Sequence, residues 1–144
     1  ETEDAFAAFY DRHQRDDLVL DKWFAIQAAA PGASRLEKVN TLLSHPRFTL
    51  RNPNRARSLI GSFAGLNPVV FHRADGAGYA WVADRLTELD AINPQISARL
   101  ATAFRAWRTL EPTRRKAAEA TLRKLAAMPQ LSTDLKDIVD RTLA

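Results

Sequence analysis

Apolar residues recur at helical spacing along nearly the whole chain, and the clearest stretch lies near its middle. Asn52 can cap a helix there, and Pro53 suits the first helical position because no hydrogen bond is lost at that point. The apolar residues that follow form a stripe that must face a core: Ala56, Leu59, Ile60, Phe63 and Ala64. Gly65 can stop this helix, and Asn67-Pro68 can start the next turn.

The same spacing predicts helices on both sides of this stretch. Upstream, we expect a helix over residues 1–14, a second from a cap at Asp16 or Asp17 to Pro31-Gly32, and a third over Arg35 to Ser44. Downstream, we expect a turn over Asp75 to Gly78 and then a helix that begins at Tyr79. The next helix should run from the Asn93-Pro94 cap to Trp107. Two more should follow, one from Glu111-Pro112 to Met128-Pro129 and a last one capped by Ser132 or Thr133.

Strand patterns of period two are missing throughout the sequence, which predicts an all-α fold. Helices of about 10–16 residues with short breaks favour antiparallel pairs. Such pairs pack as a bundle, or as an α-solenoid of the ARM/HEAT type or a similar superhelical array. No fixed repeat length is evident, so the pattern alone does not define repeats.

Polar residues flank two of the predicted stripes. At about 100° per residue, Arg57 lies on one flank of the central stripe and Arg55 on the other. Gly61, one turn after Arg57, presents no side chain, so another group can approach the backbone beside that arginine. Gln95 and Arg99 are also one turn apart and share a flank of their helix. Polar side chains on these flanks can bind a carbonyl or carboxylate group, or they can tie neighbouring helices together.

The length of 144 residues suits one domain, and the shares of hydrophobic and charged residues, 46% and 26%, are ordinary for a globular protein. No run of 18 apolar residues is present, so we expect no membrane-spanning helix and no membrane partner. Glu1 begins an acidic stretch without the features of a signal peptide. The absence of cysteine excludes disulfides and thiolate metal sites, and we expect a cytoplasmic location.

The net charge of +4 is unevenly distributed. Residues 1–21 hold seven acids and two bases, whereas residues 93–124 hold eight bases and two acids. This uneven distribution of charge fits a solvated face, a contact with another domain or a nucleic-acid surface. The basic stretch Arg114-Arg115-Lys116 opens a helix, where positive charge is unfavourable, and this hints at a partner.

Catalytic and metal-binding patterns are not evident in the sequence. The histidines, at positions 13, 45 and 72, are widely spaced, and none belongs to the His-Glu-x-x-His pattern that a helical zinc site requires. No Gly-x-Ser-x-Gly nucleophile turn occurs, and Gly76-x-Gly78 reads as a turn rather than as an anion site. We therefore expect no metal, no cofactor and no catalytic residue in this chain.

The stretch from Asn52 to Gly65, with Asn67-Pro68 and Phe71-His72, closely resembles the C-terminal helical domain of bacterial aminopeptidase N, the family of zinc-dependent alanyl aminopeptidases. The resemblance covers nearly the whole chain. Its other motifs are Asp21-Lys22-Trp23-Phe24, Asp75-Gly76, Gly78-Tyr79, Asn93-Pro94-Gln95, Arg99-Leu100 and Leu143-Ala144.

The resemblance implies that residues 1–144 form one all-α segment of a larger enzyme. In that family, this domain covers the catalytic domain and encloses the active-site cavity. Positions matching Gln95 and Arg99 are implied to face the cavity, near the subsite for the residue after the cleaved bond, and Arg57 is a weaker candidate of the same kind. The curved layering of that domain favours the solenoid among the possible all-α arrangements.

The resemblance also implies the partners. The catalytic domain of the same polypeptide would hold zinc, its ligands and the general base, and the substrate would be a peptide. We expect the isolated 144-residue chain to be inactive. The alternative is a stand-alone helical scaffold that binds a protein or a nucleic acid through its basic C-terminal half, although we do not expect nucleic acid as a partner.

Overall fold

The computed structural model describes residues 2–13 and 16–144, whose regular secondary structure is helical with no strand among them. The helices are α1 (Thr2–His13), α2 (Asp17–Ala29), α3 (Arg35–Leu42), α4 (Pro53–Ala56), the π-helical η1 (Arg57–Gly61), α5 (Ser62–Leu66), α6 (Pro68–Phe71), α7 (Ala77–Asp90), α8 (Pro94–Ala101), the 3₁₀ turns η2 (Thr102–Phe104) and η3 (Trp107–Thr109), α9 (Pro112–Ala126) and α10 (Thr133–Leu143).

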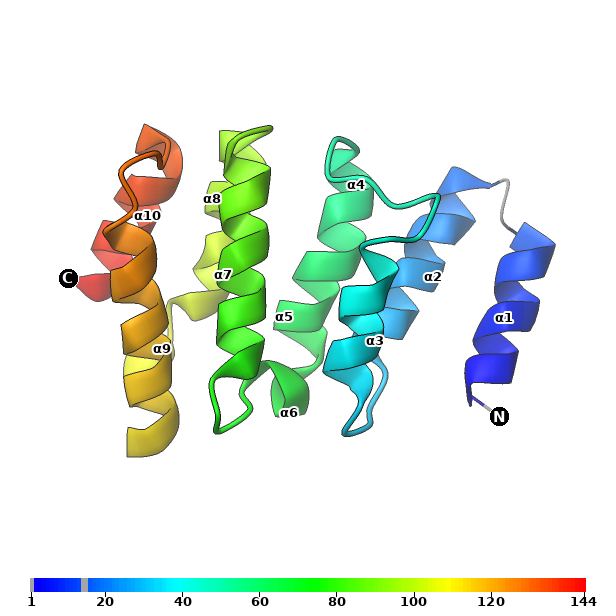
Figure 1. Cartoon of the computed structure of the whole chain (residues 1–144), viewed down its shortest axis with the longest axis horizontal. Helices are drawn as coiled ribbons and strands as arrows, with labels where there is room; N and C mark the ends of the chain where they lie inside the picture. The colour runs from blue at the N-terminus through cyan, green and yellow to red at the C-terminus, as the bar shows by residue number, and fades with distance from the viewer. Residues whose placement is uncertain (1, 14–15) are drawn as a thin grey trace.

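The helices stack side by side into an elongated array that runs from α1 at one end to α10 at the other (Figure 1). The segments α4, η1 and α5 form one continuous helix, called the central helix below. One layer consists of α2, the central helix, α8 and α10, because α2 packs against η1 and α5, η1 against α8, and α8 against α10. The second layer contains α3, α7 and α9; in Figure 1, α3 lies in front of α2 and α7 in front of α8. The predicted all-α array of antiparallel helices is confirmed.

The core runs continuously between the two layers. Large side chains less than 2% exposed come from α2, the central helix, α6, α7, α9 and α10. The stripe predicted for the central helix is confirmed, since Ala56, Leu59, Ile60 and Phe63 are all 0% exposed. Ala64 is partly buried against the same core.

The central helix begins where the sequence predicts and carries a π-helical turn that the sequence did not reveal. The Asn52 side-chain oxygen accepts a hydrogen bond from Arg55 N at 3.1 Å, and Pro53 is the first helical residue. The π-helical turn η1 accommodates one extra residue per turn and shifts the side chains that follow. At the far end, Asn67 is buried and its amide nitrogen donates to the carbonyl oxygens of Ala28, at 2.9 Å, and Ala30, at 3.0 Å.

Two predicted boundaries are wrong. The helix expected to reach Trp107 ends at Ala101 and gives way to the 3₁₀ turn η2. The turn expected to extend to Gly78 ends at Gly76, which adopts a φ of 78° and caps α7. Gly78 is instead helical and packs on α6, where a β-carbon would lie only 2.3 Å from Phe71 O. The sequence analysis assigned this glycine to a turn. In the structure, glycine is required at this position because the backbones of two helices approach closely.

Indole hydrogen bonds tie distant parts of the sequence together. Trp23 Nε1 donates to Phe6 O at 2.8 Å, Trp81 Nε1 to Asn40 Oδ1 at 2.9 Å, and Trp107 Nε1 to Thr142 O at 2.7 Å. These bonds join α1 to α2, α3 to α7, and η3 to the end of α10. Each tryptophan therefore serves both core packing and the fixing of a neighbouring helix.

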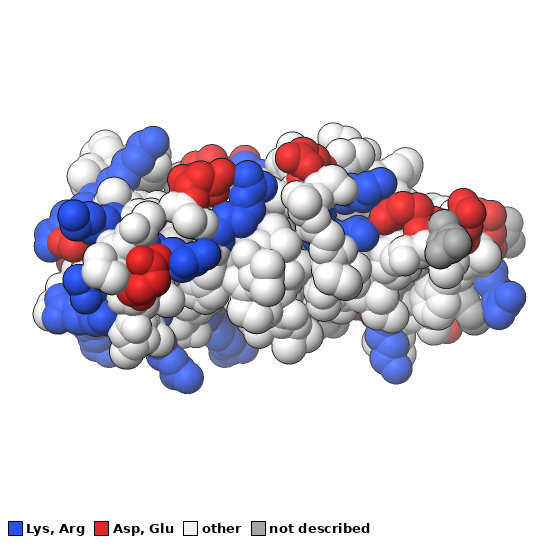
Figure 2. Space-filling model, turned by 90° about the horizontal axis from the view of Figure 1, so that it is seen from below, with Lys and Arg blue, Asp and Glu red and all other residues white. Residues whose placement is uncertain are grey.

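Charged residues are unevenly distributed on the lower edge of the array as drawn in Figure 1. Figure 2 shows this edge, with lysine and arginine gathered toward the C-terminal end and uncharged residues across the middle. Exposed apolar residues include Leu66 and Val69, which are 67% and 83% exposed. Within residues 2–13 and 16–144, no helix has both the length and the apolar character needed to cross a membrane.

Candidate functional site

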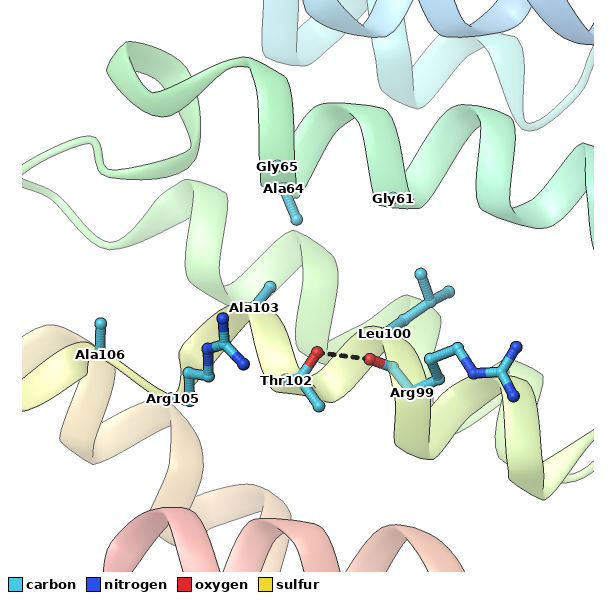
Figure 3. Close-up of a pocket in the computed structure, with 9 residues that line it drawn as sticks. All are labelled: Gly61, Ala64, Gly65, Arg99, Leu100, Thr102, Ala103, Arg105 and Ala106. Carbon is cyan, nitrogen blue, oxygen red and sulfur yellow. Dashed lines mark hydrogen bonds between the residues drawn. The ribbon is translucent and has the colours of Figure 1, made fainter.

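A groove of about 400 Å³ lies between the central helix and the α8–η2 segment (Figure 3). One wall comes from η1 and α5 and the other from α8, η2 and the turn that follows. The residues that line the groove are Gly61, Ala64, Gly65, Arg99, Leu100, Thr102, Ala103, Arg105 and Ala106. Most of these side chains are small, which leaves the space open, and none is acidic.

The two walls meet at Gly61. A β-carbon at Gly61 would lie 3.2 Å from Leu100 Cδ2, so the bare backbone of η1 lets α8 approach closely. The sequence predicted that some group could approach this glycine, and Leu100 is that group. At Gly65, a β-carbon would have no neighbour within 4 Å, so the groove opens there.

Arg99 is the one predicted site residue among those that line the groove. Its side chain is exposed and makes no hydrogen bond or ion pair within the described ranges. Gln95 is also exposed, one turn earlier on α8, but does not line the groove. Arg57 is half-buried on η1, and its guanidinium donates to the side-chain oxygen of Asn54 on the same helix. The structure thus places Arg99 in the same groove as Gly61 but gathers neither Gln95 nor Arg57 into it.

Arg105 lines the same groove and was missed by the sequence analysis. The residue follows η2, in the region where the sequence predicted an unbroken helix. Arg105 is exposed, and its side chain has no polar partner among the residues that the structure describes. The groove therefore carries two guanidinium groups that are available to an anion.

Arg55, predicted to flank the central stripe, is instead only 2% exposed. Its guanidinium lies 2.5 Å from Asp21 Oδ1 and 3.2 Å from Asp17 Oδ1. The Arg55 guanidinium carbon also lies 5.5 Å from the centre of the Phe24 ring. Because all of these partners belong to α2, Arg55 fixes the central helix to α2 and is not available to a ligand.

His45 occupies an aromatic cage. Its ring centre lies 4.9 Å from that of Tyr10, 5.3 Å from that of Trp23 and 5.4 Å from that of Phe24. His45 Nδ1 accepts a hydrogen bond from Arg47 N at 3.0 Å, so this nitrogen carries no proton. Burial, followed by the nearby arginines, lowers the pKa of His45. The ring therefore packs as a neutral group.

His72 is also held by neighbours within the fold. Its Nδ1 lies 2.6 Å from the hydroxyl oxygen of Tyr79, and burial followed by the charge of Arg114 lowers the pKa of His72. The side chain of His13 lies outside the described residues. Across the described part of the chain, no group of three His, Cys, Asp or Glu side chains could hold a metal ion. These residues do not fit a zinc site.

The start of the basic helix α9 has partners inside the chain. The Glu111 carboxylate caps α9 by accepting hydrogen bonds from Thr113 N and Arg114 N, both at 2.9 Å. These backbone bonds lower the pKa of Glu111. Arg114 pairs with Glu111 at 3.1 Å and donates from Nε to His72 O at 2.5 Å. The arginine that opens this helix therefore needs no outside partner to account for it.

Helix pairs stacked along one axis define the class of helical-repeat arrays. Within that class, this chain belongs to the family described as "Domain of unknown function (DUF3458_C) ARM repeats", whose model matches residues 1–144.

Two relatives of this chain are bacterial aminopeptidases. The chain is 42% identical to the aminopeptidase N of Escherichia coli strain K12 over 134 residues, which cover 93% of the chain and 15% of that protein. It is 40% identical to the aminopeptidase N of Caulobacter vibrioides over 141 residues, which cover 98% of the chain and 16% of that protein. The predicted resemblance to aminopeptidase N is confirmed.

A solved structure has the same fold. The crystal structure of Legionella pneumophila aminopeptidase A in complex with aspartic acid matches with a TM-score of 0.92 and 33% identity. The match covers 98% of this chain and 16% of that protein. The chain thus spans about one sixth of the length of these relatives.

Proposed function

We propose that this chain is the part of a zinc-dependent aminopeptidase that encloses the active-site cavity and positions the peptide substrate. The observation that carries the proposal is the open groove beside Gly61, where Arg99 is exposed and lacks a polar partner within the described ranges. The family membership and the aminopeptidase relatives support the same function.

The chemistry of the candidate residues suits substrate positioning. A guanidinium group donates paired hydrogen bonds to a carbonyl or carboxylate group, and a glutamine side chain both donates and accepts. Gln95 and Arg99 are exposed one turn apart on α8, which packs against the π-helical turn that carries Arg57. Side chains on two packed helices are held more rigidly than side chains on loops, as substrate positioning requires.

The reaction itself would take place elsewhere in the polypeptide. Zinc, its ligands and the general base would belong to the catalytic domain, which would be the partner of this chain, and a peptide would be the substrate. A cytoplasmic location stays a prediction. The isolated chain is expected to bind no stoichiometric zinc and to hydrolyse no alanyl anilide; turnover that survives removal of contaminating peptidases would contradict this.

The test is Arg99→Ala in the full-length enzyme. We expect kcat/KM for peptides to fall by about 10- to 100-fold, since a hydrogen bond to a charged group contributes about 1.5–3 kcal/mol. Zinc content, measured by atomic emission, should stay at the wild-type level. Gln95→Ala and Arg57→Ala are measured in parallel on peptides of several lengths.

Arg115→Ala provides the matched control, because Arg115 is an exposed arginine on α9 that does not line the groove. Its kinetics should equal those of the wild type. Unchanged kinetics for all three candidate variants across every peptide length would overturn the proposal. That result would assign these residues to the contact between domains.

A further inference from the structure

The residues that line the groove carry an excess of positive charge. Arg99 and Arg105 are both exposed, and none of the residues that line the groove is acidic. Elsewhere, Arg35, Arg55 and Arg114 are tied to partners in the chain. The two groove arginines have no such partner among the described residues, so both guanidinium groups are available to an anionic ligand.

The helix break at η2 directs the second arginine into the groove. Between Arg99 and Arg105, an unbroken α-helix would rotate by about 600°, which leaves the two side chains about 120° apart. The 3₁₀ steps of η2 turn by about 120° each, so the total becomes about 660° and the separation about 60°. The Thr102 hydroxyl donates to Arg99 O at 2.7 Å, and Arg105 N donates to Thr102 O at 3.1 Å. Both bonds hold the tightened turn in place.

The two arginines mark opposite ends of one wall. Figure 3 shows Arg105 at one end of the α8–η2 wall and Arg99 at the other, with Leu100, Thr102 and Ala103 between them. The Arg105 side chain rises toward the opposite wall, where Ala64 and Gly65 lie. Small residues on both walls leave room for an extended main chain, and about 400 Å³ falls within the range of ligand pockets.

We propose that Arg105 binds the terminal carboxylate of a short peptide substrate whose main chain lies along this groove from Arg99. This inference rests on the proposed function, in which Gln95 and Arg99 lie near the residue after the cleaved bond. From Arg99 to Arg105 the helical rise amounts to about 10 Å. An extended peptide covers that distance in about three residues. The matching substrates are therefore tetrapeptides and pentapeptides with a free carboxylate.

The experiment compares, in the full-length enzyme, alanine peptides of two to five residues that end in a free carboxylate or in an amide. The readout is the ratio of kcat/KM for the acid to kcat/KM for the amide. For the wild type, this ratio should be about ten at four and five residues and smaller for dipeptides, because one charge-assisted hydrogen bond is gained. In Arg105→Ala the ratio at four and five residues should fall to about one. Arg105→Lys should retain part of the ratio, since the positive charge remains.

Arg115→Ala is the matched control and should keep the wild-type ratio. Thermal unfolding of each variant checks that the exposed substitutions leave the fold intact. A wild-type ratio of one at every length overturns the inference, as does a ratio that Arg105→Ala leaves unchanged or that Arg115→Ala lowers equally.

Failure of the inference and failure of the proposed function give different results. Arg99→Ala could lower kcat/KM for all peptides while Arg105→Ala leaves every acid-to-amide ratio unchanged. In that case the cavity role stands and the carboxylate site falls. If the alanine variants of Arg105 and of all three candidate residues, Arg99, Gln95 and Arg57, change no peptide parameter, both the inference and the proposed function fall.

Discussion

Arg55 and Asp21 form an ion pair between the central helix and α2, with Arg55 Nε 2.5 Å from Asp21 Oδ1 and the two side chains 3% and 14% exposed. The residues are 34 positions apart in the sequence. Arg55 also donates to the carbonyl oxygen of Arg47, so this guanidinium joins the connector after α3 to both helices. The pair therefore fixes three segments to one another.

Removal of one partner should be costly. We expect Arg55→Met to lower the free energy of unfolding by about 3 kcal/mol, because Asp21 would lose its buried counter-charge. Urea denaturation monitored by circular dichroism measures this change. The double variant Asp21→Leu with Arg55→Met should be more stable than Arg55→Met alone, since no unpaired charge remains. Equal stability of the two variants would show that the loss in Arg55→Met does not come from an unpaired charge on Asp21.

Two of the helical glycines, Gly78 and Gly65, should respond oppositely to alanine. At Gly78, a β-carbon would lie 2.3 Å from Phe71 O and 2.6 Å from Val70 O, both backbone atoms. We expect Gly78→Ala to cost about 3 kcal/mol, because α6 and α7 must move apart. Gly65 has open space at the same position. Gly65→Ala should stabilise the protein by about 0.5–1 kcal/mol, through the helix preference of alanine.

Urea midpoints for both glycine variants provide the measurement. A Gly78→Ala variant as stable as the wild type would mean that the contact between α6 and the start of α7 is loose.

Ser132 links α10 to α7. Its hydroxyl donates to Asp90 Oδ1 at 2.5 Å and accepts from Leu135 N at 3.1 Å. We expect Ser132→Ala to lower the free energy of unfolding by about 1.5 kcal/mol, because a helix cap and a bond to a carboxylate are both lost. Thr133 is exposed at the next position, and Thr133→Ala should change stability by less than about 0.5 kcal/mol. If urea titrations showed equal losses of unfolding free energy for Ser132→Ala and Thr133→Ala, the assignment of Ser132 as the cap would be contradicted.

His45 should make the fold sensitive to acid. Burial lowers its pKa in the folded chain, with smaller contributions from Arg47 and Arg55, so the unfolded chain binds the proton more readily. Stability is then fully present above the unfolded pKa of about 6.5 and is lost as the pH falls below it, toward the lower folded pKa. Protonation of Nδ1 would also break the bond from Arg47 N.

Urea midpoints between pH 7.5 and 5 test this for the wild type and for His45→Phe. The variant should be less stable at neutral pH yet should lose less stability as the pH falls. An unchanged slope would assign the acid sensitivity to other groups, among them His72.

Features set by a few neighbouring residues could be predicted from the sequence. The caps Asn52 and Asn93 and the following prolines appear where expected, since a cap depends only on the first turn of its own helix. For the last helix, the sequence left two candidates, and the structure selects Ser132 because Asp90, on α7, holds its hydroxyl. The buried stripes could be predicted in the same way, from the helical spacing of the apolar residues.

Features set by contacts distant in sequence could not be predicted. Helical period placed Arg55 on a flank, but its burial depends on the carboxylates of α2. The sequence named Arg99, through the resemblance, and Gly61, through its missing side chain, but it did not predict that the two residues would line one groove. Arg105 was missed because its direction depends on the helix break at η2, and no glycine or proline marks that break.

The indole hydrogen bonds of the three tryptophans give the array built-in reporters of local opening. Trp23, Trp81 and Trp107 belong to the beginning, middle and end of the stack, and each is tied to a different helix contact. Stacked helical arrays can open from one end while the rest stays folded. Single-tryptophan versions would therefore show, by the order in which their fluorescence changes in denaturant, which end of the array opens first.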